Sequence, residues 1–363
     1  MTVIESVHED HGATFVERGG RRVVDHYGRP ARTVRAVRNG VGAIEADYGI
    51  VVVTGDDRID FVDNAVSNRV PATDGEGTFA LLLDPQGGIE TELYAYSAGE
   101  RLLLFVPPGE AEPLVADWRE NVFIEDVELR VATGEFGVFG VHGPKATEKV
   151  ASVVHGDPPP DERLTFVRGE TADVGVTVIR TDAPTGEESY EIVCGAADAA
   201  AVFDSLINRG LNAVPFGRRT WDSLTCEAGS ALFETELAGQ IPNVAGIRSA
   251  LDFEKGCYVG QEVVSRVENR GRPSRRLVGL LPDERPDAGA AVFAGDAAVG
   301  EVTRAVDSPT LDRPIALAFV ETGADLTDPT VRVDGETVPT ERTTLPFVEG
   351  SDRSGRLPQY PEG

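Results

Sequence analysis

The segment 255–262, Lys-Gly-Cys-Tyr-Val-Gly-Gln-Glu, places a cysteine thiol in a setting that could support chemistry. Glycines close to Cys257 permit a tight turn or a positive φ. The apolar spacing of residues 261–267 predicts a short helix, so the thiol would lie just before a helix N-terminus. The helix dipole and the ammonium of Lys255 would both favour the thiolate there. The segment therefore predicts a reactive cysteine, and the open alternative is a small apolar residue packed into a tight corner.

The other two cysteines, Cys194 and Cys226, are spaced for neither a disulfide framework nor a CxxC metal pair. Each lies in a strand-like or helix-like stretch, so we expect both to pack in the core. One reactive thiol cannot hold a stable iron–sulfur cluster, so no permanently bound metal is expected.

The chain is expected to be cytoplasmic. Its unpaired cysteines suit a reducing compartment. No apolar run approaches the length of a membrane span, and residues 1–10 lack the basic and apolar layout of a signal peptide.

The chain carries a strong acidic excess. Its 61 Asp and Glu against 34 Lys and Arg give a formal net charge of −27, and only three of the basic residues are lysines. Such a field is self-repulsive in dilute buffer but is screened over about 3 Å at 1 M salt, so the composition predicts a halophilic protein. The acidity also argues against nucleic-acid binding. The arginine-rich segment 266–276 is a local exception, which could hold an anionic ligand or form surface ion pairs.

Periodicity divides the first 275 residues into two α+β units of the same kind. Each runs through a hairpin, a short turn and an amphipathic helix, which predicts two ferredoxin-like halves packed together. We place the halves at 41–155 and 161–275, after a weakly patterned segment 1–40. Helices are expected at 55–68, 108–120 and 197–208, and strands at 49–54, 79–83, 89–96, 101–106, 174–180 and 189–194.

After residue 275 the pattern changes to short strands at close spacing, which is typical of a small antiparallel β-barrel. These strands are expected at 277–281, 291–294, 298–303, 315–320 and 330–333. The barrel domain is predicted at 276–345. The remainder, 346–363, is rich in Gly, Pro, Ser and charge, which predicts a disordered tail.

The segment 255–262 resembles the K-G-C-[FY]-x-G-Q-E signature of the YgfZ folate-binding proteins, which are relatives of the glycine cleavage T-protein. The matching residues are Lys255, Gly256, Cys257, Tyr258, Gly260, Gln261 and Glu262. Shorter segments between residues 53 and 303 also resemble this superfamily, so the resemblance covers residues 45–325.

The resemblance implies a three-domain fold in which the two halves form a funnel for tetrahydrofolate and the barrel closes it. It implies that Glu187 contacts the folate, a role that suits a carboxylate because it can accept two neighbouring N–H donors of a pterin. Folate binding is likewise expected of Asn68 and Tyr190, and of Arg218 and Arg219 at the folate tail.

Two departures from the T-protein pattern bear on catalysis. T-proteins carry an aspartate pair after a Gly-Gly-Ile turn, where this chain has Glu90, Thr91 and Glu92. Glu92 is the alternative catalytic carboxylate, but its extra methylene moves the carboxylate further than the positioning tolerance of a catalytic group. The paired T-protein arginines before Leu-Glu-Ala-Gly are replaced by Trp221 and Thr225.

The cysteine motif favours a YgfZ-type function. Such a protein would bind tetrahydrofolate and support iron–sulfur cluster assembly or repair in client enzymes, including tRNA-modifying ones, with Cys257 as the reactive group. The alternative is an aminomethyltransferase that moves a one-carbon unit from a lipoylated H-protein to tetrahydrofolate. It requires a carboxylate beside the reacting amine, for which Glu92, Glu90 or Asp84 are the candidates. A folate-storing scaffold without chemistry is a third hypothesis.

Overall fold

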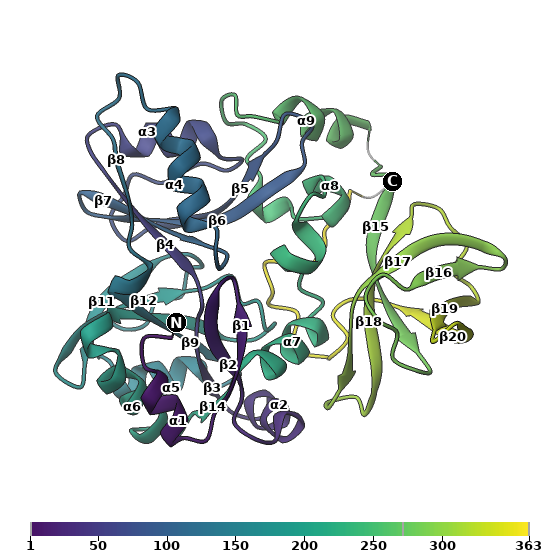
Figure 1. Ribbon diagram of the computed structural model, residues 1–363, viewed down its shortest axis with the longest axis horizontal. Coiled ribbons are helices and arrows are strands. Elements are labelled where there is room, and N and C mark those ends of the chain that lie inside the picture. Colours follow the sequence, from purple (N-terminus) through teal and green to yellow (C-terminus); the bar gives the residue numbers. More distant parts are fainter. Residues whose placement is uncertain (1, 271, 362–363) are drawn as a thin grey trace.

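Two β-sheets pack face to face in the larger part of the molecule, and helices cover their outer faces (Figure 1). The computed structural model describes residues 2–270 and 272–361. The first sheet is antiparallel, with the order β5-β6-β7-β4-β8. Its strands are β4 (Gly49–Thr54), β5 (Gly77–Leu83), β6 (Ile89–Ala98), β7 (Arg101–Val106) and β8 (Glu128–Val131), and its outer helices are α3 (Arg58–Ala65) and α4 (Ala111–Glu120).

The second sheet has seven strands in the order β10-β11-β12-β13-β9-β3-β14. They are β3 (Gly42–Glu45), β9 (Phe136–His142), β10 (His155–Gly156), β11 (Phe166–Thr171), β12 (Val174–Arg180), β13 (Ser189–Gly195) and β14 (Val214–Pro215). Helices α5 (Ala146–Val153) and α6 (Ala199–Asn208) cover its outer face.

Strand β4 shows why these strands read as continuous apolar runs. Ile50 and Val52 belong to the core between the two sheets, whereas Val51 and Val53 pack against α3 and α4. Successive side chains of a strand point to opposite faces, and here both faces are covered. The predicted strand therefore matches the observed bounds of β4 at 49–54.

The chain crosses between the sheets in a way that differs from the predicted halves. Strands β3 and β9 precede residue 155, yet both belong to the second sheet. The loop 156–161, expected to join the halves, follows β10 inside that sheet. Periodicity reports whether a segment is a strand and which face is apolar, but it carries no information about the pairing partner.

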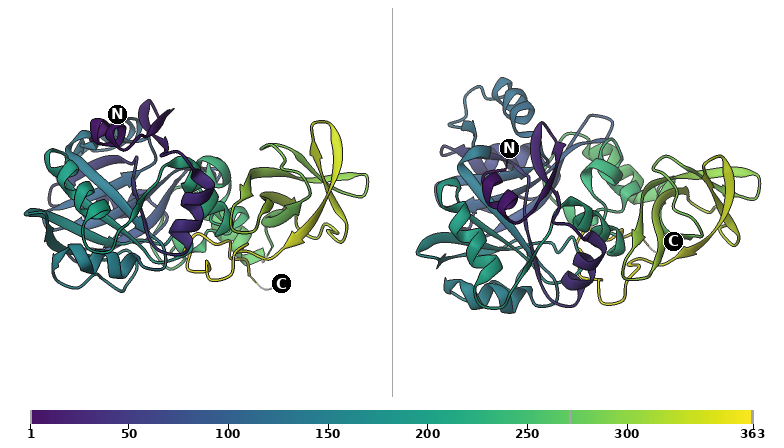
Figure 2. Two further views of the ribbon diagram at one scale, coloured as in Figure 1. Left: turned by 90° about the horizontal axis from the view of Figure 1, so that it is seen from below. Right: turned by 60° about the horizontal axis from the view of Figure 1, so that its bottom comes forward.

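A closed barrel with the order β15-β18-β17-β16-β19-β20 forms the smaller part of the molecule and lies to one side of the sheets (Figure 2). Its strands are β15 (Arg275–Pro282), β16 (Ala291–Ala294), β17 (Ala297–Ser308), β18 (Arg313–Glu321), β19 (Pro329–Val333) and β20 (Glu336–Thr343). Pairing of β15 with β20 closes it. The sequence does not reveal β20, because only Val338 and Thr340 of this polar strand are buried.

The weakly patterned N-terminal segment is ordered. It contains α1 (Glu5–Asp10), the hairpin β1 (Thr14–Arg18) and β2 (Arg21–His26), and α2 (Pro30–Arg38). The Glu45 carboxylate anchors its start, accepting hydrogen bonds from the Val3 amide at 2.9 Å and the His8 ring at 2.7 Å. Polar anchors of this kind leave no apolar periodicity for sequence reasoning to detect.

The described part of the C-terminal segment, 346–361, is also packed rather than disordered. Ser351, Ser354 and Arg356 are buried. The amide of Gly355 donates to the Asp182 carbonyl at 2.7 Å, and the amide of Gln359 donates to the Gly246 carbonyl at 2.8 Å. A composition rich in Gly, Pro and Ser predicts that a segment has no core of its own, but this one is held by contacts to the rest of the chain.

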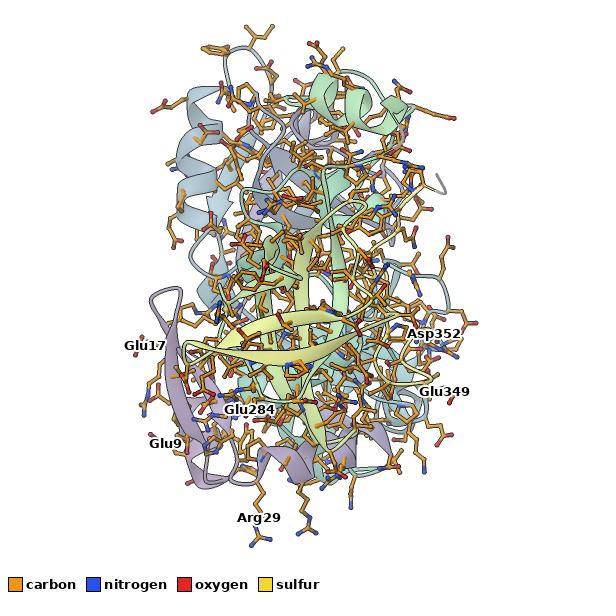
Figure 3. The ribbon with its side chains drawn as sticks, turned by 90° about the vertical axis from the view of Figure 1, so that its right-hand side faces the viewer. Glu9, Glu17, Arg29, Glu284, Glu349 and Asp352 are labelled. Atoms are coloured by element: carbon orange, nitrogen blue, oxygen red, sulfur yellow. The ribbon has the colours of Figure 1, made fainter. Side chains whose placement is uncertain are left out.

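Charged side chains extend from the molecule in the view of Figure 3, where those labelled include Glu9, Glu17, Glu284, Glu349 and Asp352. Two arginines in and after α9 (Gln261–Arg270) form ion pairs of the surface type. Arg266 pairs with Glu262 at 2.8 Å and Arg275 with Glu301 at 3.5 Å. In the described part of the chain, no helix is long and apolar enough to cross a membrane.

Candidate active site

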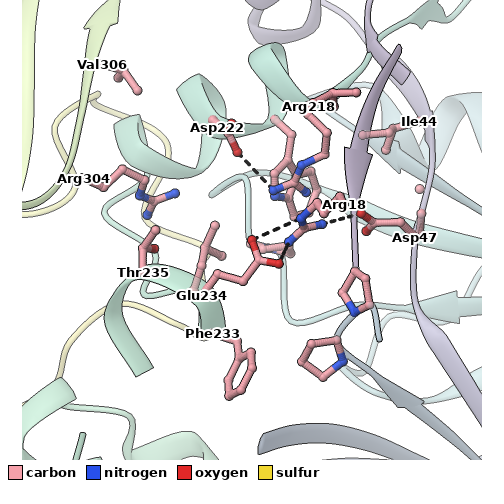
Figure 4. A pocket seen from close by; sticks show the side chains of 18 of the residues that line it. Arg18, Ile44, Asp47, Arg218, Asp222, Phe233, Glu234, Thr235, Arg304 and Val306 are labelled. Carbon is pink, nitrogen blue, oxygen red and sulfur yellow. Dashed lines mark hydrogen bonds and ion pairs between the residues drawn. The ribbon is translucent and has the colours of Figure 1, made fainter. Parts of the chain in front are cut away.

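A cavity of about 650 Å³ lies where the two sheets, helix α7 (Arg218–Glu227) and the barrel meet (Figure 4). Its walls come from β1, the loop after β3, β6, β13, α7, the turn at 233–237 and β17. Elements distant in sequence converge there, which suits a site built by the whole fold rather than by one motif.

Glu191 on β13 is a buried carboxylate that lines this cavity. Only 5% of the residue is exposed, and the Tyr48 hydroxyl donates a hydrogen bond to its Oε1 at 2.7 Å. Burial raises the pKa of Glu191 to about 7, although the Tyr48 hydrogen bond opposes the shift. Among the described residues, Tyr48 is the only hydrogen-bond partner of this carboxylate, so Oε2 can accept from a ligand.

Glu92 on β6 is the second cavity carboxylate, and it is held by an arginine from the C-terminal segment. Nη1 and Nη2 of Arg356 each donate to one Glu92 oxygen at 2.9 Å. Nε of Arg356 donates to Asp182 at 2.9 Å, and the Tyr94 hydroxyl donates to the same Asp182 oxygen at 2.9 Å. Tyr94 follows Glu92 by two residues, so both side chains lie on the same face of β6.

Three carboxylates thus surround one guanidinium. Asp182 raises the pKa of Glu191 further by like-charge repulsion, whereas Arg356 lowers it. Near neutral pH the cavity therefore contains an ionisable acid close to its midpoint, which is typical of binding and catalytic sites.

Ion pairs border one side of the cavity (Figure 4). Arg18 on β1 pairs with Asp47 and, at 2.7 Å, with Glu234 of the turn at 233–237. Arg218 pairs with Asp222 one helical turn along α7, at 3.1 Å. These arginines are anchored by carboxylates, so they are oriented before any ligand arrives.

Arg304 reaches the cavity from β17 of the barrel. Its Nη1 donates to the Thr225 hydroxyl at 2.9 Å and its Nη2 to the Ser230 carbonyl at 2.6 Å. Its Nε is buried without a hydrogen-bond partner in the described residues. Thr225 stands where the resemblance places a T-protein arginine, and a guanidinium from the barrel lies against that threonine.

His142 lines the cavity as a neutral imidazole. It is 2% exposed, and its Nδ1 lies 2.9 Å from the Ser189 hydroxyl. Burial lowers the pKa of His142 to about 3, so it is uncharged at pH 7 and is not positioned to act as a cationic acid.

The carboxylate of Glu191 and the arginines of the cavity suit a flat ligand that presents N–H groups to Glu191 and a negatively charged group to the arginines. A carboxylate with a free oxygen accepts charge-assisted hydrogen bonds from ring N–H and amino groups. Glu92 adds a second negative charge, which would stabilise an amine as it gains a proton.

Lys255 of the cysteine motif has a packing role. Its buried ammonium donates to the carbonyls of Asp63 at 2.5 Å, Val66 at 2.9 Å and Asn68 at 3.0 Å. These carbonyls lie at and beyond the end of α3, where a helix leaves acceptors unsatisfied. Burial lowers the pKa of Lys255. The ammonium therefore fixes the chain after α3 and does not reach the cavity.

Cys257 is exposed and lies outside the cavity lining, four residues before the start of α9. Gly260 has a φ of +79° and lies against the β5–β6 turn, where an added Cβ would meet the Asp84 carbonyl oxygen at 2.7 Å. Tyr258 is buried beside the Lys255 ammonium.

The remaining motif residues point to the same structural role. The Gln261 side chain donates weakly to the Lys255 carbonyl at 3.5 Å, and Glu262 is exposed. Gly256 has open space around its Cα. The conspicuous motif is therefore a connector that docks on the first sheet, away from the cavity.

The structure brings only part of the predicted folate set together. Glu187 pairs with Arg38 at 3.0 Å outside the cavity, and burial raises its pKa. Tyr190 points away from the cavity, where its hydroxyl lies 2.9 Å from that of Thr147. Because side chains alternate along β13, its neighbour Glu191 faces the cavity instead.

The other predicted site residues lie partly outside and partly inside the cavity. The side-chain amide of Asn68 donates hydrogen bonds to the carbonyls of Phe79 and Ser249, outside the cavity. Arg219 pairs with Asp25 at 2.7 Å, and most of its side chain is exposed. Arg218 and Glu92 do line the cavity.

Sequence reasoning missed Glu191, Arg304 and Arg356. Alternation along the run 189–194 could have separated the two faces of β13 and indicated Glu191. The two arginines come from the barrel and the C-terminal segment, and nothing local marks them.

Named relatives can be aligned with nearly the whole chain. An aminomethyltransferase of Saccharopolyspora erythraea is 31% identical over 359 residues, which is 96% of this chain and 97% of the relative. An aminomethyltransferase of Geobacillus kaustophilus is 31% identical over 358 residues, with 95% and 98% covered. The chain also shares its fold with the crystal structure of glycine cleavage system aminomethyltransferase T from Bartonella henselae, with a TM-score of 0.83, 22% identity and 99% of each chain covered.

These relatives overturn the predicted YgfZ-type role in iron–sulfur cluster assembly. Proteins 30% identical over almost the full length carry the name aminomethyltransferase, which was the alternative. The prediction was wrong because it gave the eight-residue segment 255–262 more weight than the rest of the chain.

Two family models account for most of the sequence. The GCVT N-terminal domain matches residues 4–255, and the glycine cleavage T-protein C-terminal barrel domain matches residues 275–349. The second match contains the closed barrel, and the first contains both sheets together with Glu92 and Glu191. The chain belongs to the glycine cleavage T-protein family.

Proposed function

We propose that this protein is a cytoplasmic aminomethyltransferase that uses tetrahydrofolate as the one-carbon acceptor and a lipoyl-borne aminomethyl group as the donor. The observation that carries the proposal is the central cavity, in which the buried carboxylate of Glu191 and the partly exposed carboxylate of Glu92 lie among anchored arginines. The names of its relatives support the same reaction.

The reaction balances without an oxidant or reductant. The carbon–sulfur and carbon–nitrogen bonds of the aminomethyl group break, and two carbon–nitrogen bonds form to the folate. The two protons released from the folate nitrogens go to the lipoyl thiolate and to the departing amine, so the products are methylene-tetrahydrofolate, dihydrolipoyl thiol and ammonia.

Glu191 is proposed to bind and orient the pterin. When ionised, its Oε2 accepts N–H donors while Tyr48 holds Oε1 at 2.7 Å. Its pKa of about 7 means that the binding form predominates in mildly alkaline solution. The anchored Arg218 is placed to attract the carboxylate end of the folate.

Glu92 is proposed to be the carboxylate beside the reacting amine. A negative charge at this point stabilises the ammonium that leaves, and the cavity walls limit access of water. Glu92 thus takes the place that the aspartate pair holds in T-proteins.

The test is turnover by the full chain in molar NaCl with tetrahydrofolate and aminomethyl-loaded H-protein. Methylene-tetrahydrofolate and ammonia should form in equal amounts. Glu92→Gln should lower kcat by about 10²-fold or more, the range lost when one group that stabilises transition-state charge is removed. Cys257→Ser, outside the cavity, is the matched control and should keep full turnover. Folate binding without any product, in an assay where a reference T-protein is active, would refute the proposal.

A further inference from the structure

We propose that the C-terminal segment completes the active site, with Arg356 as the positioning residue for Glu92. The inference rests on the proposed aminomethyltransferase function and concerns a residue that lies beyond the matched barrel domain, which ends at 349.

Arg356 has its whole hydrogen-bonding capacity engaged inside the protein. Its residue exposure is 3%. Nη1 and Nη2 hold the two oxygens of Glu92 at 2.9 Å each, in the parallel geometry that a guanidinium forms with a carboxylate. The remaining N–H groups reach Asp182 at 2.9 Å, the Tyr94 hydroxyl at 2.7 Å and the Ala231 carbonyl at 3.3 Å.

The backbone on either side of Arg356 is equally fixed. The Arg356 carbonyl accepts from the Ala231 amide at 3.1 Å, and the Gly355 amide donates to the Asp182 carbonyl at 2.7 Å. The Ser354 hydroxyl lies 2.6 Å from that of Ser230. The guanidinium therefore sits on a rigid base and not at the end of a loose tail.

Glu92 needs such a partner. A glutamate has one more side-chain torsion than an aspartate, so its carboxylate samples more positions when it is free. A displacement of about 1 Å at a catalytic group can cost about 10²-fold in rate. Two parallel hydrogen bonds to a fixed guanidinium restrict the Glu92 carboxylate to one place.

Arg356 also balances the charge of the cavity. It lowers the pKa of Glu191, which Asp182 raises. Without the guanidinium, the cluster of Glu92, Asp182 and Glu191 would lose the cation that Arg356 supplies. Glu191 would then ionise only at higher pH.

The experiment compares Arg356→Lys and Arg356→Gln with the wild type in full-length protein. Lysine keeps the charge but cannot form the parallel pair, which keeps this variant folded while removing the restraint on Glu92. We expect kcat to fall at least tenfold in Arg356→Lys, while KM for tetrahydrofolate changes less than threefold. Arg353→Gln is the matched control, because Arg353 lies on the same segment as Arg356 but its exposed side chain pairs with Glu188, just before β13, and does not line the cavity.

A double variant separates positioning from a purely structural role. Glu92→Gln combined with Arg356→Lys should be no slower than Glu92→Gln alone, since the arginine acts through the glutamate. In Arg356→Gln, the rise of activity with pH should move to higher pH than in the wild type.

The outcomes distinguish the two proposals. Full kcat in folded Arg356→Lys, or a lower melting temperature with unchanged turnover per folded molecule, overturns the positioning role and leaves the function standing. No turnover by the wild type itself overturns the function and, with it, this role.

Discussion

Replacing Glu191 with glutamine tests the cavity most directly, because the structure predicts opposite effects on stability and on binding. Glutamine has nearly the same shape and can still accept the Tyr48 hydrogen bond. It cannot ionise, and its amide presents N–H donors where the carboxylate presents an acceptor.

The stability effect follows from the raised pKa. In the unfolded chain Glu191 ionises near its ordinary value of 4.5, and in the folded protein near 7. The folded state therefore retains a proton that the unfolded state loses. The contribution of protonated Glu191 to the free energy of unfolding is fully present below pH 4.5 and is lost as the pH rises through 7. At 1.36 kcal/mol per pH unit, the wild type forgoes about 3 kcal/mol at pH 8.

Glu191→Gln does not incur this loss. It should be more stable than the wild type at pH 8 by up to about 3 kcal/mol, which corresponds to about 4 °C in melting temperature for a chain of this size unfolding as one unit. At pH 4.5 the difference should vanish.

Binding should change in the other direction. Hydrogen bonds to a charged group contribute about 1.5–3 kcal/mol, so tetrahydrofolate should bind about 10- to 100-fold more weakly to Glu191→Gln at pH 8. The wild-type affinity should rise through pH 7, and that of the variant should not.

The assay is differential scanning calorimetry from pH 4.5 to 8.5 in constant molar NaCl, with calorimetric titration of tetrahydrofolate under the same conditions. Glu187→Gln is the control for folate binding, because that residue lies outside the cavity. A variant that is less stable than the wild type at pH 8, or that binds folate equally well, would refute the reasoning.

Three further predictions concern other parts of the chain. His142→Gln should resist acid unfolding better than the wild type. The buried imidazole has a pKa of about 3 in the folded protein and 6.5 in the unfolded chain, so the wild type loses about 5 kcal/mol of stability as the pH falls from 6.5 to 3. Acid unfolding followed by circular dichroism checks this, and parallel unfolding curves for the two proteins would contradict it. Lys255→Met should destabilise the fold by about 3 kcal/mol or more, since three carbonyls lose their donor; turnover per folded molecule should be unchanged, and a loss of kcat without a loss of stability would contradict the packing role. The net charge of −27 predicts a melting temperature that rises by at least about 5 °C from 0.1 to 2 M NaCl, as screening shortens from about 10 Å to below 3 Å; a melting temperature that falls would contradict salt adaptation.

Elements whose apolar pattern is local could be predicted from the sequence. Strand β7 has its predicted bounds, 101–106, because all its residues except Arg101 are buried. Helix α4 presents Leu114, Val115 and Trp118 to the first sheet, as its spacing indicates. Packing of this kind leaves a periodic signal in the residues themselves.

Elements held by polar or distant contacts could not be predicted. The N-terminal hairpin is tied to the cavity border by Arg18, and the C-terminal segment by Arg356. Both depend on carboxylates more than 25 residues away, and no local pattern records such pairs. The same holds for β3 and β9, which precede residue 155 but belong to the second sheet.

The site residues divide by the same physical rule. Glu92 was found because it follows a recognisable turn, and Arg218 because it lies just upstream of the positions where T-proteins carry paired arginines. Glu191 was missed in favour of Glu187, although a strand that places Tyr190 against the outer helices must turn Glu191 to the opposite face. Reading the alternation of β13 before the resemblance would have selected the residue that lines the cavity.

The cysteine motif makes structural contacts that can account for its residue types without a chemical role. Lys255 satisfies three carbonyls after α3, and Gly260 permits an approach to the β5–β6 turn that a Cβ would block. Such constraints select residue types as stringently as catalysis does, and all their partners lie within one sheet and its connections. The cavity, by contrast, draws one carboxylate from each sheet, an arginine from the barrel and another from the C-terminal segment. Because the cavity is assembled from four parts of the chain, each part carries only a weak sequence signal. The proposed function therefore rests on the fold and the relatives together, and not on the segment 255–262.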